Sequence, residues 1–285
     1  MAALVPGGVA PVVLAVRGAV VVVRVGDVVL KAHEPGAGVV ELSARLRLAG
    51  DLRLRELVLP PLSVSPSVVE GRVVTVWPLG VPVPERDPVS APLEEAGRLL
   101  AALHRFGPAD FGGVGPVSGA PQRMVRAVDE LRRAGLGRRA DVVLRAFGTL
   151  PLVEAPARVV VCHGDWHLGQ MVLAGGWRLI DVDDLGFGDP AWDLARPAAL
   201  YAAGVLDPET WGRFLDSYVA AGGVAVDARD PWVALDVPAR ALVIQMAARA
   251  LVAAQRDEKV LDEAQEALLE ACDRIVAAHP HMARG

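Results

Sequence analysis

The chain of 285 residues has little of several residue types, and each shortage excludes a class of structure or partner. Two cysteines, Cys162 and Cys272, are too few for a disulfide framework or a thiolate metal site in a chain of this length. The formal net charge is -5, so a basic surface for nucleic-acid phosphates is not expected. Arg17, Arg24 and Asp27 interrupt the apolar N-terminal region, which leaves no window there long enough to span a bilayer. We therefore expect a cytoplasmic protein that binds neither nucleic acid nor membranes.

Lysine, asparagine and aromatic residues are also scarce. Aromatic residues make up 5% of the chain, so the core is expected to be aliphatic. Of the 29 basic residues only Lys31 and Lys259 are lysines, and asparagine is absent. Because arginine is otherwise the rule, a lysine inside a predicted strand, as at Lys31, indicates a specific role. Valine dominates the first half, and alanine and leucine the last third, which predicts a strand-rich part followed by a helical part.

Hydrophobic periodicity and turn residues predict an α+β fold with two lobes. Strands are expected at 11–17, 19–25, 28–33, 57–64 and 72–77, with one helix at 39–48 between the third and fourth. A proline-rich stretch then predicts the boundary between an N-terminal lobe, residues 1–80, and a C-terminal lobe, residues 81–285. In the second lobe Ser90 is expected to cap the first helix, and further helices are expected at 122–134, 138–147, 190–203, 208–221, 231–254 and 258–278. A buried strand at 159–162 and a hairpin at 171–180 lie among them.

Two segments carry the residues that point to chemistry. Residues 161–170 read Val-Cys-His-Gly-Asp-Trp-His-Leu-Gly-Gln, and residues 179–194 read Leu-Ile-Asp-Val-Asp-Asp-Leu-Gly-Phe-Gly-Asp-Pro-Ala-Trp-Asp-Leu. Phosphoryl transfer needs a carboxylate beside the attacking hydroxyl, oxygen ligands for Mg²⁺ and a cation on the phosphates. Asp165 follows a strand and Gln170 comes five residues later, while Asp181 ends a strand of the next hairpin. The hairpin turn can therefore bring Asp181 back beside the other two residues.

Both segments resemble the aminoglycoside phosphotransferase family. Its catalytic loop reads His-Gly-Asp-x-His-x-x-Asn, and its metal loop reads Ile-Asp-x-x-x-x-Gly-x-Gly-Asp-Pro-x-x-Asp-Leu. Choline kinases, fructosamine kinases and some bacterial sugar kinases are similar. The resemblance implies a protein-kinase-like two-lobed fold, with a five-stranded antiparallel sheet and one helix in the N-terminal lobe and a mainly helical C-terminal lobe. It also implies transfer of the γ-phosphate of ATP or GTP, with Mg²⁺, to a hydroxyl group of a small molecule.

The resemblance assigns the reacting groups residue by residue. Asp165 would be the catalytic base, and Gln170 and Asp181 would bind Mg²⁺. Gln170 stands where the family most often has asparagine, and its longer side chain still offers an oxygen ligand. Asp183 is a nearby competitor for the role of Asp181.

The same resemblance assigns the residues around the nucleotide and the loops. Lys31 would hold the α- and β-phosphates, with Glu41 as its ion-pair partner and Glu56 as the alternative partner. Trp77 and Leu79 would belong to the nucleotide site. Three further residues, His163, His167 and Asp193, would support the two loops.

Other classes of protein are less consistent with the sequence. A protein kinase needs an activation segment that docks a peptide, and the seven residues between Asp181 and Asp189 are too few for one. A metallohydrolase could use His163, Asp165 and His167, but only histidines near the C-terminus follow them. A non-catalytic nucleotide- or drug-binding pseudokinase would have lost Asp165 or Asp181, and both are present.

The acceptor is left open by the motifs. An aminoglycoside or another antibiotic is the first hypothesis, and an amino sugar or a sugar is the alternative. Residues 201–285 hold 13 acidic and 8 basic residues, which favours an acceptor that carries amines. Six of these acidic residues are expected near the acceptor, namely Asp207, Glu209, Asp216, Asp227, Asp230 and Asp236. A monomer or a homodimer is expected.

Overall fold

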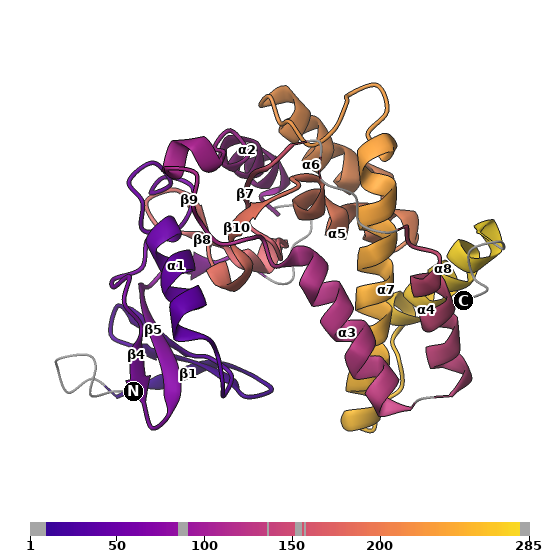
Figure 1. The fold of residues 1–285 in the computed structure, drawn as a ribbon, viewed down its shortest axis with the longest axis horizontal. Coiled ribbons are helices and arrows are strands. Elements are labelled where there is room, and N and C mark those ends of the chain that lie inside the picture. The colour runs from indigo at the N-terminus through magenta and orange to yellow at the C-terminus, as the bar shows by residue number, and fades with distance from the viewer. Residues whose placement is uncertain (1–9, 85–90, 136, 152–155, 157, 280–285) are drawn as a thin grey trace.

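The computed structural model describes residues 10–84, 91–135, 137–151, 156 and 158–279, so Ser90 lies outside the described residues. The N-terminal part is a five-stranded antiparallel sheet in the order β1-β2-β3-β5-β4 (Figure 1). Its strands are β1 (Val12–Arg17), β2 (Val20–Val25), β3 (Val28–Ala32), β5 (Arg72–Pro78) and β4 (Ser67–Val69). Runs of valine account for these strands, because branched side chains pack well on a pleated surface.

The fourth strand is not where the sequence pattern predicted it. Residues 57–64 form no sheet strand; β4 lies a few residues later and pairs with β5. Val58 instead makes an isolated parallel bridge with Leu179, and the Leu59 amide donates to the Leu179 carbonyl at 2.9 Å. Val58 and Leu59 are therefore buried against another part of the chain, while Leu62 and Val64 stay exposed. The adjacent prolines, Pro60 and Pro61, have no amide hydrogen to give to a sheet ladder.

Helix α1 (Val39–Ala49) packs beside this sheet and buries Leu42, Leu46 and Ala49 along one face. The two faces of the sheet differ in their contents. Leu30 and four other apolar side chains of β2, β3 and β5 close a small separate core on one face. Because side chains alternate along a strand, Lys31 points to the opposite face, where it lies directly across from Thr75 of β5.

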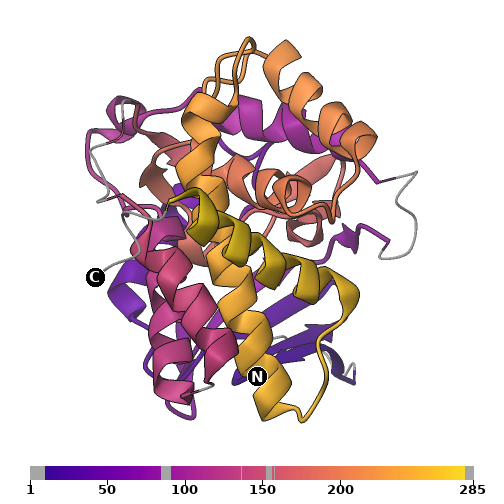
Figure 2. The same ribbon diagram turned by 90° about the vertical axis from the view of Figure 1, so that its right-hand side faces the viewer.

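The C-terminal part is mainly helical (Figures 1 and 2). Its helices are α2 (Leu93–Leu103), α3 (Ala120–Ala134), α4 (Arg138–Gly148), α5 (Ala191–Ala202), α6 (Pro208–Ala220), α7 (Trp232–Arg256) and α8 (Glu263–Ala278). Helix α7 lies at the centre and contacts α3, α4, α5 and α8, while α2 packs against α6. By length and composition alone α7 could cross a membrane. However, 61% of its most apolar stretch is buried inside the protein, as in the core helix of a soluble protein.

The last helix starts later than the predicted 258–278. Glu258 has a positive φ of 51°, which ends any helical path there. Asp262 caps α8: its side chain accepts from the Gln265 amide, and the Gln265 side chain accepts from the Asp262 amide. This reciprocal capping box sets the first residue of the helix.

Short strands place both motif segments between the sheet and the helices. Strand β7 (Val160–Cys162) pairs with β10 (Gly186–Gly188), and β8 (Met171–Leu173) pairs with β9 (Trp177–Leu179). The proline-rich stretch that the sequence predicted as a plain connector contributes β6 (Val81–Pro82), which pairs with β8. The segments with Asp165 and Asp181 are thus held by β-pairing to one another and to the chain that leaves the N-terminal sheet.

Candidate active site

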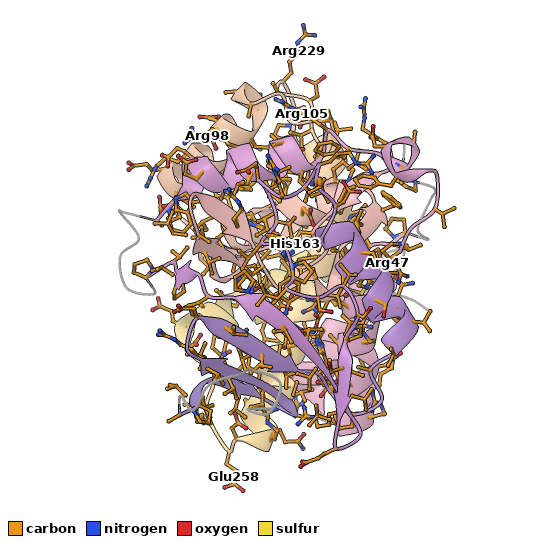
Figure 3. All side chains as sticks on the ribbon, turned by 90° about the vertical axis from the view of Figure 1, so that its left-hand side faces the viewer. Arg47, Arg98, Arg105, His163, Arg229 and Glu258 are labelled. Atoms are coloured by element: carbon orange, nitrogen blue, oxygen red, sulfur yellow. The ribbon has the colours of Figure 1, made fainter. Side chains whose placement is uncertain are left out.

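The loop that carries Asp165 follows β7 and is held in place by its neighbours. Gly164 has a φ of +85°, and a Cβ there would lie 2.3 Å from the Asp184 carbonyl oxygen, so only glycine fits. His163 is fully buried near the middle of the molecule (Figure 3). Its Nε2 donates to the Ile180 carbonyl at 2.7 Å, and its Nδ1 accepts from the Asp165 amide at 3.4 Å. The His163 ring therefore ties the Asp165 loop to the residue just before Asp181.

Asp193, in the first turn of α5, holds the other side of this loop. Its carboxylate accepts from the amides of His163 at 2.6 Å and Gly164 at 2.8 Å. His104 Nε2 lies 3.1 Å from the same carboxylate, whose side chain is fully buried. Burial acts to raise the pKa of Asp193, but the hydrogen bonds from His104 and the Gly164 amide outweigh it and lower that pKa. The ionised carboxylate therefore fixes the backbone from which Asp165 projects.

His167 supports the turn that leads to Gln170. Its Nδ1 accepts from the Gly169 amide at 3.1 Å. Burial, followed by the positive charge of Arg196, lowers the pKa of His167 to about 4, so the ring is neutral near pH 7. Both ring nitrogens of His163 are also engaged with the backbone. These contacts argue against the metallohydrolase reading, which would need the two rings to ligate a metal.

The metal-loop residues meet the lysine of the sheet. Asp181 follows β9 in the left-handed conformation, with a φ of 61°. Lys31 Nζ lies 2.5 Å from Asp181 Oδ1 and 2.7 Å from Asp183 Oδ2. Gln170 Nε2 donates to Asp181 Oδ2 at 3.1 Å. Three residues that the sequence assigned to phosphate or metal binding are thus in one hydrogen-bonded cluster, and Asp183 joins them.

The charged groups of this cluster stabilise each other's ionised forms. Burial acts to lower the pKa of Lys31, but Asp183 and Asp181 outweigh it and raise that pKa. Burial likewise acts to raise the pKa of each aspartate, and the Lys31 ammonium reverses the effect, so both carboxyl pKa values are lowered. All three groups are therefore charged at neutral pH. His33 adds a contact at 3.3 Å between its Nδ1 and Asp183 Oδ2.

The donor set of the cluster fits a hard divalent cation. Asp181 offers a carboxylate, and a half-turn of the Gln170 amide would present its oxygen on the same side. Mg²⁺ binds through one or two carboxylates together with substrate phosphates, and it prefers oxygen ligands throughout. The residues present therefore match the requirements of Mg²⁺, and the longer side chain of Gln170 reaches the position.

Glu41 is not the partner of Lys31 in this structure. Its side chain is 68% exposed and pairs with Arg45, one turn further along α1, at 2.7 Å. The Arg45 side chain is buried and also donates to the Leu185 carbonyl at 2.7 Å. Glu56, the alternative partner, forms its ion pair with Arg178. Helix α1 is thus linked to the metal loop through Arg45, while Asp181 and Asp183 neutralise Lys31 directly.

Trp77 and Leu79 lie on or next to β5, the strand beside Lys31. Trp77 is buried in the large core, and its Nε1 donates to Thr75 Oγ1 at 2.9 Å. The Leu79 amide donates to the Asp27 carbonyl at 2.9 Å. Both residues are therefore near the lysine strand, and both are engaged in holding the sheet together.

Two arginines that the sequence did not single out hold the carboxylate of Asp165. Arg196 Nη2 donates to Asp165 Oδ1 at 2.7 Å, and Arg123 Nη2 lies 2.5 Å from Asp165 Oδ2. Arg123 also contacts Asp184, which is buried next to the metal loop. Arg196 comes three residues after Asp193, just beyond the end of the second motif segment, so its proximity to the motif was a usable signal. Arg123 lies far upstream in α3, and nothing in its local sequence indicates this contact.

Known structures share this architecture at low sequence identity. A choline/ethanolamine kinase family protein from Mesorhizobium loti has a TM-score of 0.61 and 16% identity, covering 100% of this chain and 95% of that one. A thermostable mutant of the aminoglycoside phosphotransferase APH(4)-Ia, in ternary complex with AMP-PNP and hygromycin B, has a TM-score of 0.60 and 15% identity, covering 94% of each chain. The macrolide 2'-phosphotransferase MphH from Brachybacterium faecium has a TM-score of 0.50 and 20% identity, covering 94% and 93%.

These neighbours confirm the predicted kinase-like fold, with its five-stranded antiparallel sheet and helical C-terminal part. None of the curated protein sequences matches the chain. A family profile does match: the one described as the phosphotransferase enzyme family covers residues 19–235, which hold Lys31 and both motif segments. The chain therefore belongs to the phosphotransferase enzyme family, as its two motifs predicted, and is a small-molecule phosphotransferase.

Proposed function

We propose that this enzyme transfers the γ-phosphate of ATP or GTP, with Mg²⁺, to a hydroxyl group of a small molecule. The observation that carries the proposal is the cluster of Lys31, Asp181 and Gln170, held beside the Asp165 loop by His163. A phosphate-binding cation, oxygen ligands and a carboxylate are the parts that phosphoryl transfer requires. Membership of the family supports the interpretation of this combination as a site.

In the proposed reaction each residue has a defined task. The Asp165 carboxylate orients the acceptor hydroxyl and accepts its proton as the oxygen attacks the γ-phosphorus. The Lys31 ammonium donates to phosphate oxygens of the nucleotide, in exchange for part of its contact with the aspartates. Asp181 and Gln170 would hold Mg²⁺, which when bound neutralises charge on the phosphates. The buried Asp193 and His163 keep Asp165 in position.

The choice of acceptor rests on weaker support. Structural neighbours are named as aminoglycoside and macrolide phosphotransferases and as a choline/ethanolamine kinase family protein, so antibiotics and small alcohols are both candidates. Amino sugars and sugars remain the alternative from the sequence. A small acceptor is favoured over a peptide because the metal loop passes directly through β10 into α5, with no segment long enough to dock a chain.

Turnover by the purified protein tests the proposal. We expect release of ADP or GDP that depends on both Mg²⁺ and an acceptor, in a panel of aminoglycosides, macrolides, sugars, amino sugars and small hydroxy compounds. Phosphorus NMR of the product should show a phosphate monoester. Nucleotide binding without turnover of any acceptor would favour the pseudokinase alternative, and absence of nucleotide binding would contradict the proposal altogether.

Replacing Lys31 by arginine is expected to raise the Michaelis constant for nucleotide and lower the turnover rate, although the positive charge is kept. Lys31 is surrounded by two carboxylates at 2.5 and 2.7 Å, and a planar guanidinium cannot take the place of a compact ammonium there. Lys259→Arg is the matched control, because the only other lysine is exposed after α7. If Lys31→Arg behaves like this control in steady-state kinetics, Lys31 does not contact the nucleotide phosphates.

A further inference from the structure

A pocket lies beside Asp165 and is lined by side chains of three helices of the C-terminal part. Arg123 of α3, Arg196 of α5 and Gln245 of α7 line it, together with Trp166. Because Asp165 projects into the same pocket, the acceptor hydroxyl of the proposed reaction has to enter here. The charges of this pocket therefore bear on which acceptor the enzyme takes.

The acidic residues that favoured a cationic acceptor in the sequence analysis do not line this pocket. In the part of the chain that the structure describes, all six are exposed and none lines this pocket: Asp207, Glu209, Asp216, Asp227, Asp230 and Asp236. Several have ordinary structural contacts. Asp207 caps α6 through the Thr210 amide, and Asp236 pairs with Arg240 on the surface of α7. Their excess of negative charge therefore lies on the exposed surface and outside the lining of this pocket.

The pocket itself has more positive than negative groups. Asp165 is held by Arg123 and Arg196, and Arg123 also pairs with Asp184. Arg126, at 3.6 Å from Asp184, is a third guanidinium next to this group, and it lies with Asp184 just outside the pocket lining. Two negative charges thus meet three positive ones before α7 is considered.

Arg249 of α7 adds a fourth positive charge. It follows Gln245 by one helical turn, so both side chains are on the same side of α7. Arg249 is exposed and forms none of the ion pairs found among the described residues. Desolvation and then the charge of Arg123 lower the pKa of Arg249, and Asp165 and Asp184 oppose this effect, so Arg249 lies near the charged groups of the pocket without lining it. An anion placed between Arg249 and these arginines would reduce the repulsion between their positive charges.

Buried donors in this pocket also lack acceptors. Among the described residues, Nε of Arg123, Nε of Arg196 and Nε1 of Trp166 are buried and have no hydrogen-bond partner. The Trp166 side chain is an especially clear case, because the residue is only 4% exposed. Each of these groups can only donate a hydrogen bond, so what they require is an acceptor. Carboxylate and phosphate oxygens are the strongest acceptors for guanidinium groups.

We propose that the acceptor of this enzyme carries an anionic group, a carboxylate or a phosphate, which Arg196 and Arg249 bind in the pocket beside Asp165. The inference deepens the proposed function and rests on it. The bound anion takes over guanidinium donors that hold Asp165 in this structure, and the Asp165 carboxylate then becomes available to the acceptor hydroxyl. Binding of the correct substrate is thereby coupled to release of the base.

Two series of probes that differ only in charge test this inference. The first is glycerate, glycerol 3-phosphate, glycerol and 3-aminopropane-1,2-diol; the second is glucuronate, glucose and glucosamine. Binding is measured at constant ionic strength with Mg²⁺ and a non-hydrolysable ATP analogue present, by calorimetry and by the fluorescence of Trp166 and Trp192, which both line the pocket. We expect the anionic member of each series to bind at least about tenfold more tightly than the neutral one, and the amine to bind most weakly. Glycerate and glycerol 3-phosphate distinguish a carboxylate site from a phosphate site.

The variant Arg249→Gln locates the anion. It should lower the affinity for the anionic probes about tenfold and leave the neutral probes and the nucleotide unaffected. Arg256→Gln is the matched control, because Arg256 ends the same helix, is exposed and pairs with Asp257. The proposal is overturned if no anionic probe binds, if the amines bind as tightly as the anions, or if Arg249→Gln weakens nucleotide binding instead. Nucleotide affinity and turnover without these probes are measured separately, so failure of the proposed phosphotransfer is distinguished from failure of the anion site.

Discussion

Asp165→Asn should lower the turnover rate about 100- to 10,000-fold, the usual contribution of a positioned general base. The amide has the same shape as the carboxylate but cannot accept the hydroxyl proton. Nucleotide affinity should stay close to that of the unmodified protein, because Asp165 contacts Arg123 and Arg196 and takes no part in the Lys31 cluster. The loop should also keep its shape, since the buried Asp193 holds the backbone amides of His163 and Gly164.

Single-turnover kinetics and nucleotide titration separate these two effects. Asp216→Asn provides the control for loss of one negative charge, because Asp216 is an exposed residue of α6. A thermal unfolding curve would verify that Asp165→Asn is folded. Retention of half the turnover rate in that folded variant would rule out Asp165 as the base, and an equal loss of nucleotide affinity would place it in the nucleotide site.

Asp181→Asn should reduce the affinity for Mg²⁺ and nucleotide by more than about 100-fold, because even residues that only support a metal ligand contribute 10- to 100-fold. The substitution removes a charged oxygen ligand and leaves Lys31 with Asp183 as its single carboxylate partner. Gln170→Asn should lower this affinity only slightly, because asparagine keeps an amide oxygen and is the residue most often found at this position in the family. The contrast between the two substitutions is the signature of a metal site.

Asp183→Asn is the comparison that decides between the two aspartates. Asp183 contacts Lys31 and His33, whereas only Asp181 also contacts Gln170. In calorimetric titrations, the affinity for nucleotide should therefore depend less on Mg²⁺ concentration in Asp181→Asn than in Asp183→Asn. If Asp183→Asn has the larger effect on the metal dependence, the ligand is Asp183 and the role of Asp181 is to neutralise Lys31.

The sequence by itself determined the elements whose signal is local. Valine-rich segments between glycine turns predicted β1, β2 and β3, and the helical periodicity predicted most of the C-terminal helices to within a few residues. The two motif segments predicted which side chains meet: Asp181 and Gln170 are hydrogen-bonded to one another, and His163 connects their loops. These predictions succeeded because strand, turn and metal-loop geometry depend on residues that are close together in the chain.

Only the tertiary structure decided the contacts that join distant segments. Glu41 has the position expected of a partner for Lys31, yet the direction of its side chain follows from how α1 packs, and it pairs with Arg45. Residues 57–64 have the composition of a strand, but only Val58 and Leu59 are buried, and Val58 bridges to Leu179 of β9. The excess of acidic residues in the last 85 positions is visible in the composition. The composition does not show which face of each helix carries them or whether that face is exposed. The guanidinium groups that hold Asp165 come from α3 and α5, which both pack against α7, so the charge of the pocket beside Asp165 depends on helix packing, which no local pattern records.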